Sequence, residues 1–265
     1  MLIERAEAQA WAEMFLAQRA RGDDATGVDV ERFGGAVALL TDRADAPAAN
    51  RVIGLGLDAP VHVDEVAAII DEYRARHIRR FLVQWSPAAR PPDADAMFRR
   101  KGFRLVIPTL KLCRRVDHER IDMPDAPAIT EIGPDAKAVF ESTVAAPLGV
   151  PAVLAPTISS AIGLPRWHFY LAVDGDRPIA GAALFTGGDV AWCGLAATVP
   201  AARGRGAQAA LLIRRLRDAA AAGCAWVSAD TQPETPARPN PSFRNMRRLG
   251  FEMLYERANY MLEIT

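Results

Sequence analysis

The stretch TVPAARGRGAQAALLIRRLRDAAAAGC, residues 198–224, holds the features on which the interpretation of this chain depends. An Arg-Gly-Arg-Gly cluster at positions 203–206 separates an apolar run from a segment whose apolar residues recur at helical spacing. Ser, Thr or Asp would cap a helix better here, because their side chains accept a bond from a free backbone N–H. Glycine instead permits unusual dihedral angles and close approach of the backbone. The stretch therefore indicates either an ordinary loop or a place where the backbone comes close to an anion.

Several features of the cluster suit a phosphate-bearing ligand. A helix N-terminus presents unpaired N–H groups and the positive end of the helix dipole. Arg203 and Arg205 would add charged donors that match phosphate oxygens. The common dinucleotide and Walker patterns do not fit, since Gly204 and Gly206 are followed by Ala209 and no Gly-Lys-Ser/Thr is present. The cluster predicts a diphosphate site of another kind.

The overall composition is that of a globular protein without a strong charge bias. The chain has 265 residues, with 32 basic and 32 acidic side chains. This balance argues against a nucleic-acid partner bound through a basic face. The cysteines, Cys113, Cys193 and Cys224, lie far apart without metal-binding spacing, and no long apolar run predicts a membrane span. We expect a cytoplasmic protein that holds no metal and contacts no membrane.

The two halves of the chain resemble each other. Residues 97–112 and 245–262 both contain a helical pattern with paired arginines, then Gly-Phe, then a long strand pattern. Upstream, GLGLDAP at 54–60 parallels GLAATVP at 194–200, in the same order. A unit this long predicts a duplicated domain, because solenoid repeats are much shorter. We expect a first domain over 1–116, a polar linker over 117–127 and a second domain over 128–265.

The halves differ at the glycine cluster. Where the second half has PAARGRGAQAALL, the first has PVHVDEVAAII, in which every glycine and arginine of the cluster is missing. The predicted helix persists without them. The fold itself therefore does not require these glycines, and the second half keeps them for another reason.

The order of elements in the second half resembles the GNAT superfamily of acyl-CoA-dependent N-acetyltransferases. Strand patterns precede Pro-x-x-Arg-Gly-x-Gly, a long helix, a further strand and an arginine-rich short helix that ends in Gly-Phe. The resemblance covers about residues 128–264 and depends on VPAARGRGAQAALL and NMRRLGFE. It implies an α+β protein of two tandem GNAT-like domains, each a mixed, mostly antiparallel sheet flanked by helices. By this resemblance, the first domain would be degenerate.

The resemblance also implies a cofactor site for acetyl-CoA as co-substrate. The amides of residues 203–208 would bind the pyrophosphate, and the strand before them would pair with the pantetheine arm. Gln208 stands where the family usually has Gly or Ala. Asn245 lies on a helix where the family often places a cofactor contact. The residues implied in cofactor binding are Ala197, Thr198, Val199, Arg203, Gly204, Arg205, Gly206, Ala207, Gln208 and Asn245.

The catalytic residues are not defined by the sequence. The family commonly takes its acid from a Tyr four residues before the Gly of Gly-Phe, and this place is Met246. Its frequent base, a Glu on the strand before the cluster, is missing from AWCGLAATV. Asp230, Tyr255 and Tyr260 are weak candidates for proton transfer, each with an ordinary structural role as the alternative.

Three functions remain open from the sequence. The first is acetyl transfer from acetyl-CoA to an amine, which would belong to a small molecule rather than a peptide. The second is an acyl-CoA-binding sensor or partner module without catalysis, which the vacant acid and base places favour. The third is an unrelated phosphate-binding fold. The sequence leaves the oligomeric state open, a homodimer included.

Overall fold

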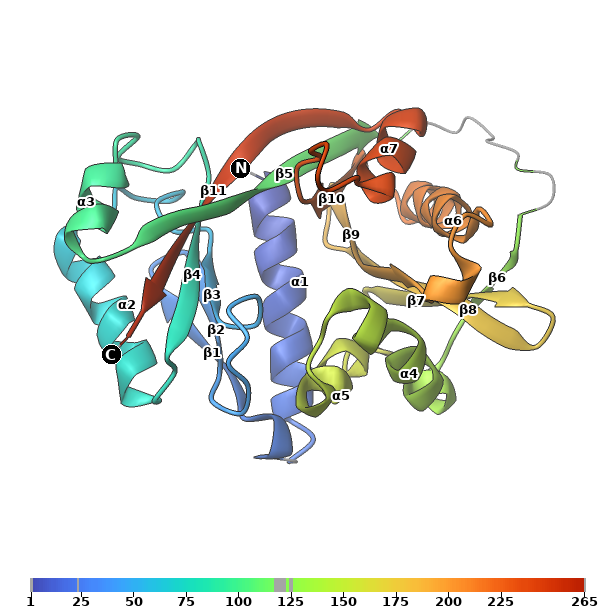
Figure 1. Ribbon diagram of the computed structural model, residues 1–265, viewed down its shortest axis with the longest axis horizontal. Helices are drawn as coiled ribbons and strands as arrows, with labels where there is room; N and C mark the ends of the chain where they lie inside the picture. The colour runs from blue at the N-terminus through green and yellow to red at the C-terminus, as the bar shows by residue number, and fades with distance from the viewer. Residues whose placement is uncertain (1, 23, 117–122, 124–125, 265) are drawn as a thin grey trace. The chain divides into compact units, whose positions relative to one another are not determined.

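The computed structural model describes residues 2–22, 24–116, 123 and 126–264, and these residues form two compact units. Unit 1 comprises residues 1–110 and 255–265, and unit 2 comprises residues 111–254. The predicted α+β class is confirmed, since mixed sheets and helices alternate along the chain (Figure 1). None of the described helices is both long and apolar enough to cross a membrane.

Unit 1 is built around strands of mixed direction. The elements are α1 (Leu2–Arg19), β1 (Val28–Phe33), β2 (Ala36–Thr41), β3 (Arg51–Ile53), α2 (Val63–Ala75), β4 (Arg80–Trp85), α3 (Asp95–Arg100), β5 (Arg104–Arg115) and the last strand of the chain, β11 (Glu252–Glu263). The sheet has the order β1-β2-β3-β4-β11-β5, in which β3 and β4 run parallel and the pairs β1–β2, β2–β3 and β4–β11 run antiparallel. A short 3-10 turn, Asp24–Thr26, precedes β1.

The helix α2 covers this sheet with an apolar face. Val66, Ile69 and Tyr73 are buried, and the Tyr73 ring stacks on Phe81 of β4 with centroids 3.9 Å apart. The Tyr73 hydroxyl donates to the Leu39 carbonyl on β2, 2.9 Å away. Aromatic packing and one buried hydrogen bond thus join α2 to two strands.

Unit 2 contains a similar succession of strands, with one more antiparallel pair before its parallel pair. The elements are β6 (Ala128–Glu131), α4 (Lys137–Leu148), α5 (Ala155–Ser159), β7 (Trp167–Asp174), β8 (Arg177–Thr186), β9 (Val190–Thr198), α6 (Ala207–Ala221), β10 (Trp226–Thr231) and α7 (Pro241–Arg248). Its sheet has the order β5-β10-β9-β8-β7-β6, with β9 and β10 parallel and the pairs β6–β7, β7–β8 and β8–β9 antiparallel. Further 3-10 turns are Pro134–Ala136, Ala152–Leu154 and Pro200–Ala202.

The two units have one kind of crossover in common. In unit 1 the parallel strands β3 and β4 are joined through α2, and in unit 2 the parallel strands β9 and β10 are joined through α6. Figure 1 shows α6 and α4 on opposite sides of the strands β7–β9. The helix of the glycine cluster therefore lies at the crossover of unit 2.

The compact units differ from the predicted ranges 1–116 and 128–265. β5 begins in unit 1 and ends in unit 2, whereas β11 begins in unit 2 and ends in unit 1. In unit 1, β11 pairs with β4 from Ala258↔Trp85 to Glu263↔Arg80. The last strand of the sequence thus completes the sheet of the first unit. The predicted linker 117–127 lies mostly outside the described residues.

Candidate functional site

The glycine cluster forms the connection between β9 and α6. After the 3-10 turn Pro200–Ala202, Arg203 is extended, and Gly204 and Gly206 have φ of 81° and 79°. L-residues adopt this left-handed region at a cost of about 1–2 kcal/mol, whereas glycine does so freely. A Cβ at Gly204 would meet nothing within 4 Å. The backbone conformation, and not lack of space, therefore explains the glycine at position 204.

The N-terminus of α6 has open backbone amides. Gly206 is its N-cap and has no side chain to accept from the first turn, which also contains no acidic residue. By contrast, the N-terminus of α7 is closed, because the Asn240 side chain accepts from the Phe243 amide at 3.1 Å. Uncapped N–H groups at the positive end of a helix bind anions. The 15-residue helix α6 therefore offers such a site.

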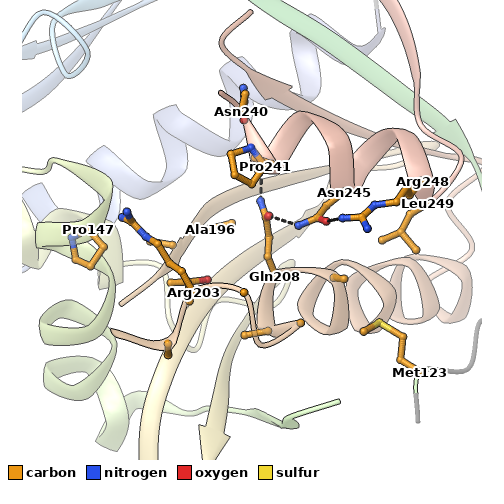
Figure 2. A pocket seen from close by; sticks show the side chains of 18 residues that line it. Met123, Pro147, Ala196, Arg203, Gln208, Asn240, Pro241, Asn245, Arg248 and Leu249 are labelled. Carbon is orange, nitrogen blue, oxygen red and sulfur yellow. Dashed lines mark hydrogen bonds between the residues drawn. The ribbon is translucent and has the colours of Figure 1, made fainter. Parts of the chain in front are cut away.

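The open end of α6 borders a cavity of about 860 Å³ (Figure 2). Strand β9, the glycine cluster, α6 and α7 contribute to its walls. The lining residues are Met123, Pro147, Ala196, Ala197, Thr198, Ala202, Arg203, Gly204, Gly206, Ala207, Gln208, Ala209, Asn240, Pro241, Ser242, Asn245, Arg248 and Leu249. The residues predicted for cofactor binding are among them, except Val199 and Arg205.

The charged side chains at this cavity are basic. Arg203 and Arg248 line it, and the described lining residues include no carboxylate. The exposed Arg203 side chain has no ion-pair partner among the described residues, and Figure 2 shows it extended away from its own backbone. Arg205 instead pairs with Asp174, 3.0 Å away, on the surface. Uncapped amides together with an arginine that has no ion-pair partner in the described part of the chain fit a diphosphate group.

Gln208 and Asn245 connect the two helices of the cavity. The Gln208 side chain donates from Nε2 to Ser242 Oγ at 2.6 Å and accepts at Oε1 from Asn245 Nδ2 at 2.6 Å. Arg248 donates in turn to Asn245 Oδ1. Figure 2 shows this chain of bonds crossing from α6 to α7. The long side chain at 208, in place of Gly or Ala, thus has a structural partner on α7.

Strand β9 bulges where it meets the cavity. Gly181 of β8 lies opposite Ala197, but Ala183 lies opposite Gly194, so that Leu195 and Ala196 share a single partner residue. Leu195 has a φ of 50°, in the left-handed region, and Ala196 lines the cavity. A bulge removes backbone groups from the ladder and redirects them. No signal in GLAAT predicts this irregularity.

A buried arginine lies behind the bulge. Arg215 of α6 is 1% exposed, and its Nη1 donates to the carbonyls of Ala183 and Gly194 at 3.3 and 3.5 Å. Arg215 therefore does not belong to a solvated face of α6, although it lies in the arginine-rich stretch 214–217. A run of arginines on a helix gives no sign of which one points inward, so the sequence could not identify it.

The catalytic candidate Asp230 contacts side chains of neighbouring strands. Its carboxylate accepts from Trp192 Nε1 at 3.1 Å and lies 3.9 Å from Nζ of Lys111, whose side chain is fully buried. Asp230 is not among the cavity-lining residues. The geometry favours the structural role over proton transfer.

The two tyrosine candidates lie in unit 1, outside the cavity lining. The Tyr255 hydroxyl donates to Glu4 at 2.7 Å, and the Tyr260 hydroxyl donates to Asp95 at 3.1 Å. Burial is the main cause that raises the pKa of both phenols, and the neighbouring carboxylates raise it further. The pKa of Tyr260 is raised to about 12. A phenol that holds its proton so tightly is a poor acid at neutral pH. Both side chains anchor β11 in unit 1.

Other reactive groups do not gather at the site. Cys113, Cys193 and Cys224 are buried free thiols, and burial raises the pKa of Cys193. Met246, which occupies the family's tyrosine place, is buried. The described residues contain no group of three potential metal ligands.

Comparison with known proteins agrees with this geometry. Residues 156–230, which contain β9, the glycine cluster and α6, match the family described as Acetyltransferase (GNAT) domain. This part of the chain is therefore similar to a GNAT domain. The predicted resemblance to the GNAT superfamily is thereby confirmed, and the matched range includes the open end of α6.

Solved structures extend the likeness to the whole fold. A GCN5-related N-acetyltransferase from Kribbella flavida is 17% identical, with 97% of this chain and 96% of that chain covered and a TM-score of 0.64. Another from Sphaerobacter thermophilus is 19% identical, with 98% and 93% covered and a TM-score of 0.61. A tandem GNAT protein from the clavulanic acid biosynthesis pathway is 16% identical, with 94% and 87% covered and a TM-score of 0.61. The search of curated proteins finds no match. The likeness supports a GNAT-like fold along the chain.

Proposed function

We propose that this protein is an N-acetyltransferase that moves an acetyl group from acetyl-CoA to the amine of a small molecule. The open, glycine-rich end of α6 at the wall of a cavity is the observation that carries the proposal. Arg203, which has no ion-pair partner among the described residues, adds a positive charge there. The acetyltransferase match over residues 156–230 supports acyl transfer as the chemistry.

The parts of the cavity would have three roles in this reaction. The amides at the start of α6 and the Arg203 guanidinium would hold the diphosphate of acetyl-CoA, which supplies the activated acyl group. The bulge at Leu195 and Ala196 would direct backbone donors towards the reacting carbonyl oxygen, where negative charge develops. The acceptor amine would enter from the part of the cavity bordered by Pro147 and Asn240.

Proton transfer is the step for which the cavity provides least. Acyl transfer forms the bond between nitrogen and the acyl carbon, breaks the carbon–sulfur bond, and moves a proton from the amine to the sulfur. Carboxylate, histidine, tyrosine and cysteine are all missing from the described lining residues. We propose direct attack by an amine that enters neutral, with solvent as the proton carrier. The buried free thiols suit a reducing compartment, and we propose the cytoplasm.

The second candidate is a sensor that binds acyl-CoA without turnover. The same missing acid and base favour it. Release of CoA in the presence of a panel of small amines, followed by thiol detection, separates the two functions. Binding of acetyl-CoA without CoA release for any amine of the panel would favour the sensor.

The first experiment is thermal unfolding with and without acetyl-CoA for the native protein, Gly204→Glu and Gly223→Glu. The two glycines are matched, because both have positive φ (81° and 77°) and space for a Cβ, and they lie near opposite ends of α6. Ligand at 100 times its Kd adds about 2.7 kcal/mol of stability, or roughly 5–10 °C. We expect this shift for the native protein and Gly223→Glu, and its loss for Gly204→Glu. No shift for the native protein would refute the cofactor, and an equal shift for both variants would refute its position.

A further inference from the structure

The hydrogen bonds between α6 and α7 form a relay that ends on a hydroxyl group. The relay runs from Arg248 through Asn245 and Gln208 to Ser242. All four residues line the cavity. Arg248 and Asn245 lie on the same face of α7 as Ser242, spaced three residues apart. The relay is therefore part of the cavity wall.

The arginine fixes the direction of every bond in this relay. A guanidinium has only donors, so the atom of Asn245 that faces Arg248 must be the oxygen. The amide nitrogen of Asn245 then faces Gln208, whose oxygen accepts from it. The amide nitrogen of Gln208 consequently faces Ser242, and Ser242 Oγ can only accept from it. Because each amide has one acceptor and one donor end, no member can reverse alone.

This direction leaves the hydrogen of the Ser242 hydroxyl available. A serine hydroxyl accepts at its lone pairs and donates a single hydrogen. Ser242 Oγ accepts from Gln208, and its own hydrogen has no acceptor among the described residues. The positive charge of Arg248 polarises the relay, which makes that hydrogen a stronger donor. The cavity is the place where an acceptor can reach it.

We propose that Ser242 donates this hydrogen bond to the pantetheine arm of the bound acyl-CoA. Arg248, Asn245 and Gln208 are positioning residues that keep the hydroxyl donating into the cavity. The proposal rests on the proposed function and deepens it, because it assigns a ligand contact to a residue that the sequence analysis did not select. It also explains the glutamine at 208, since a Gly or Ala there would interrupt the relay.

The acceptor atom on the ligand is either an amide oxygen of the arm or the sulfur at its end. Titration calorimetry with CoA and with desulfo-CoA, which lacks the sulfur, distinguishes them. We expect Ser242→Ala to weaken CoA binding about 3- to 10-fold, as for loss of one hydrogen bond. Ser242→Thr, which keeps the hydroxyl, should bind as the native protein does. Loss for both ligands assigns an oxygen, and loss for CoA alone assigns the sulfur.

A double-mutant cycle tests the relay. Arg248→Met frees the two amides to turn, so that Ser242 can donate to Gln208 instead of the ligand. We expect Arg248→Met to weaken binding, and to do so much less when Ser242 is already Ala. Arg247→Met is the matched control, because Arg247 lies on the same helix, donates to the Phe251 carbonyl and does not line the cavity.

The outcomes separate the inference from the function on which it rests. Native protein that does not bind CoA would refute the proposed function itself. Native protein that binds CoA, with Ser242→Ala equal to it for both ligands, would overturn the inference alone. Additive effects of Ser242→Ala and Arg248→Met would show two independent contacts and overturn the relay.

Discussion

The buried charge cluster of unit 1 allows a quantitative test of what joins the two ends of the sequence. Arg257 of β11 is fully buried, and its Nη1 lies 2.7 Å from Glu4 Oε2 and 2.6 Å from Glu7 Oε2 of α1. Its Nη2 also donates to Glu7 Oε1 at 3.1 Å, so Glu7 is held at both oxygens. The Glu4 and Glu7 side chains are each 1% exposed. Replacing Arg257 would therefore leave two carboxylates buried without their cation.

We expect Arg257→Met to lower the free energy of unfolding by about 3–5 kcal/mol, because breaking a buried ion pair from one side leaves an uncompensated charge. At about 2–4 °C for each kcal/mol, the melting temperature would fall by about 6–20 °C. The matched control is Arg104→Met. Arg104 pairs with Glu263 at 2.7 Å on the surface, with both side chains more than half exposed. Such an exposed pair contributes at most about 1 kcal/mol.

A rescue variant identifies the cause of the loss. Adding Glu4→Gln and Glu7→Gln to Arg257→Met removes the unpaired charges while keeping side-chain size, and should restore more than half of the lost stability. Urea unfolding followed by far-UV circular dichroism measures all four proteins. Equal losses for Arg257→Met and Arg104→Met, or no gain from the two glutamines, would refute the assignment of the loss to buried charge.

Two further predictions concern α7 and the last strand. Asn240→Ala removes the N-cap of α7 and the hydrogen bonds to Thr231 and Gln232, and should lower the free energy of unfolding in urea by about 1–2 kcal/mol. Asn240→Asp keeps a capping oxygen and should lower it less. Equal losses for the two variants would exclude capping as the cause. Tyr260→Phe tests the raised phenol pKa of about 12. Because the folded state holds this proton more tightly than the unfolded state, whose pKa is 10.0, the native protein should lose stability as pH rises from 10 towards 12. The stability difference between the native protein and Tyr260→Phe should shrink over that range, and a constant difference would contradict the prediction.

The secondary structure was largely predictable from the sequence because local patterns determine it. Helical spacing of apolar residues indicated the helices that begin at Val63 and Ala207. The Gly-Phe pairs at 102–103 and 250–251 correctly placed the ends of α3 and α7, since glycine with positive φ ends a helix. The strand Val28–Phe33 was missed, because its polar and charged residues do not form an apolar run.

The residues predicted to bind the cofactor come from a contiguous motif, apart from Asn245, and the structure places most of them around one cavity. The catalytic candidates were weaker, since they depended on where distant strands meet. Tyr255 and Tyr260 follow the glycine cluster in the sequence, yet β11 pairs with β4, so both phenols find partners in unit 1. No local pattern in β11 specifies which sheet the strand will enter.

The sequence by itself determined the repeat, the helix with the open N-terminus and the backbone freedom at Gly204 and Gly206. Each of these follows from neighbouring residues, through spacing, capping and dihedral preference. Only the tertiary structure decided that Arg215 is buried behind the β9 bulge and that Ser242 ends a relay starting at Arg248. Those features depend on which groups meet across elements, because the direction of a hydrogen bond is set by the partner and not by the position in the chain.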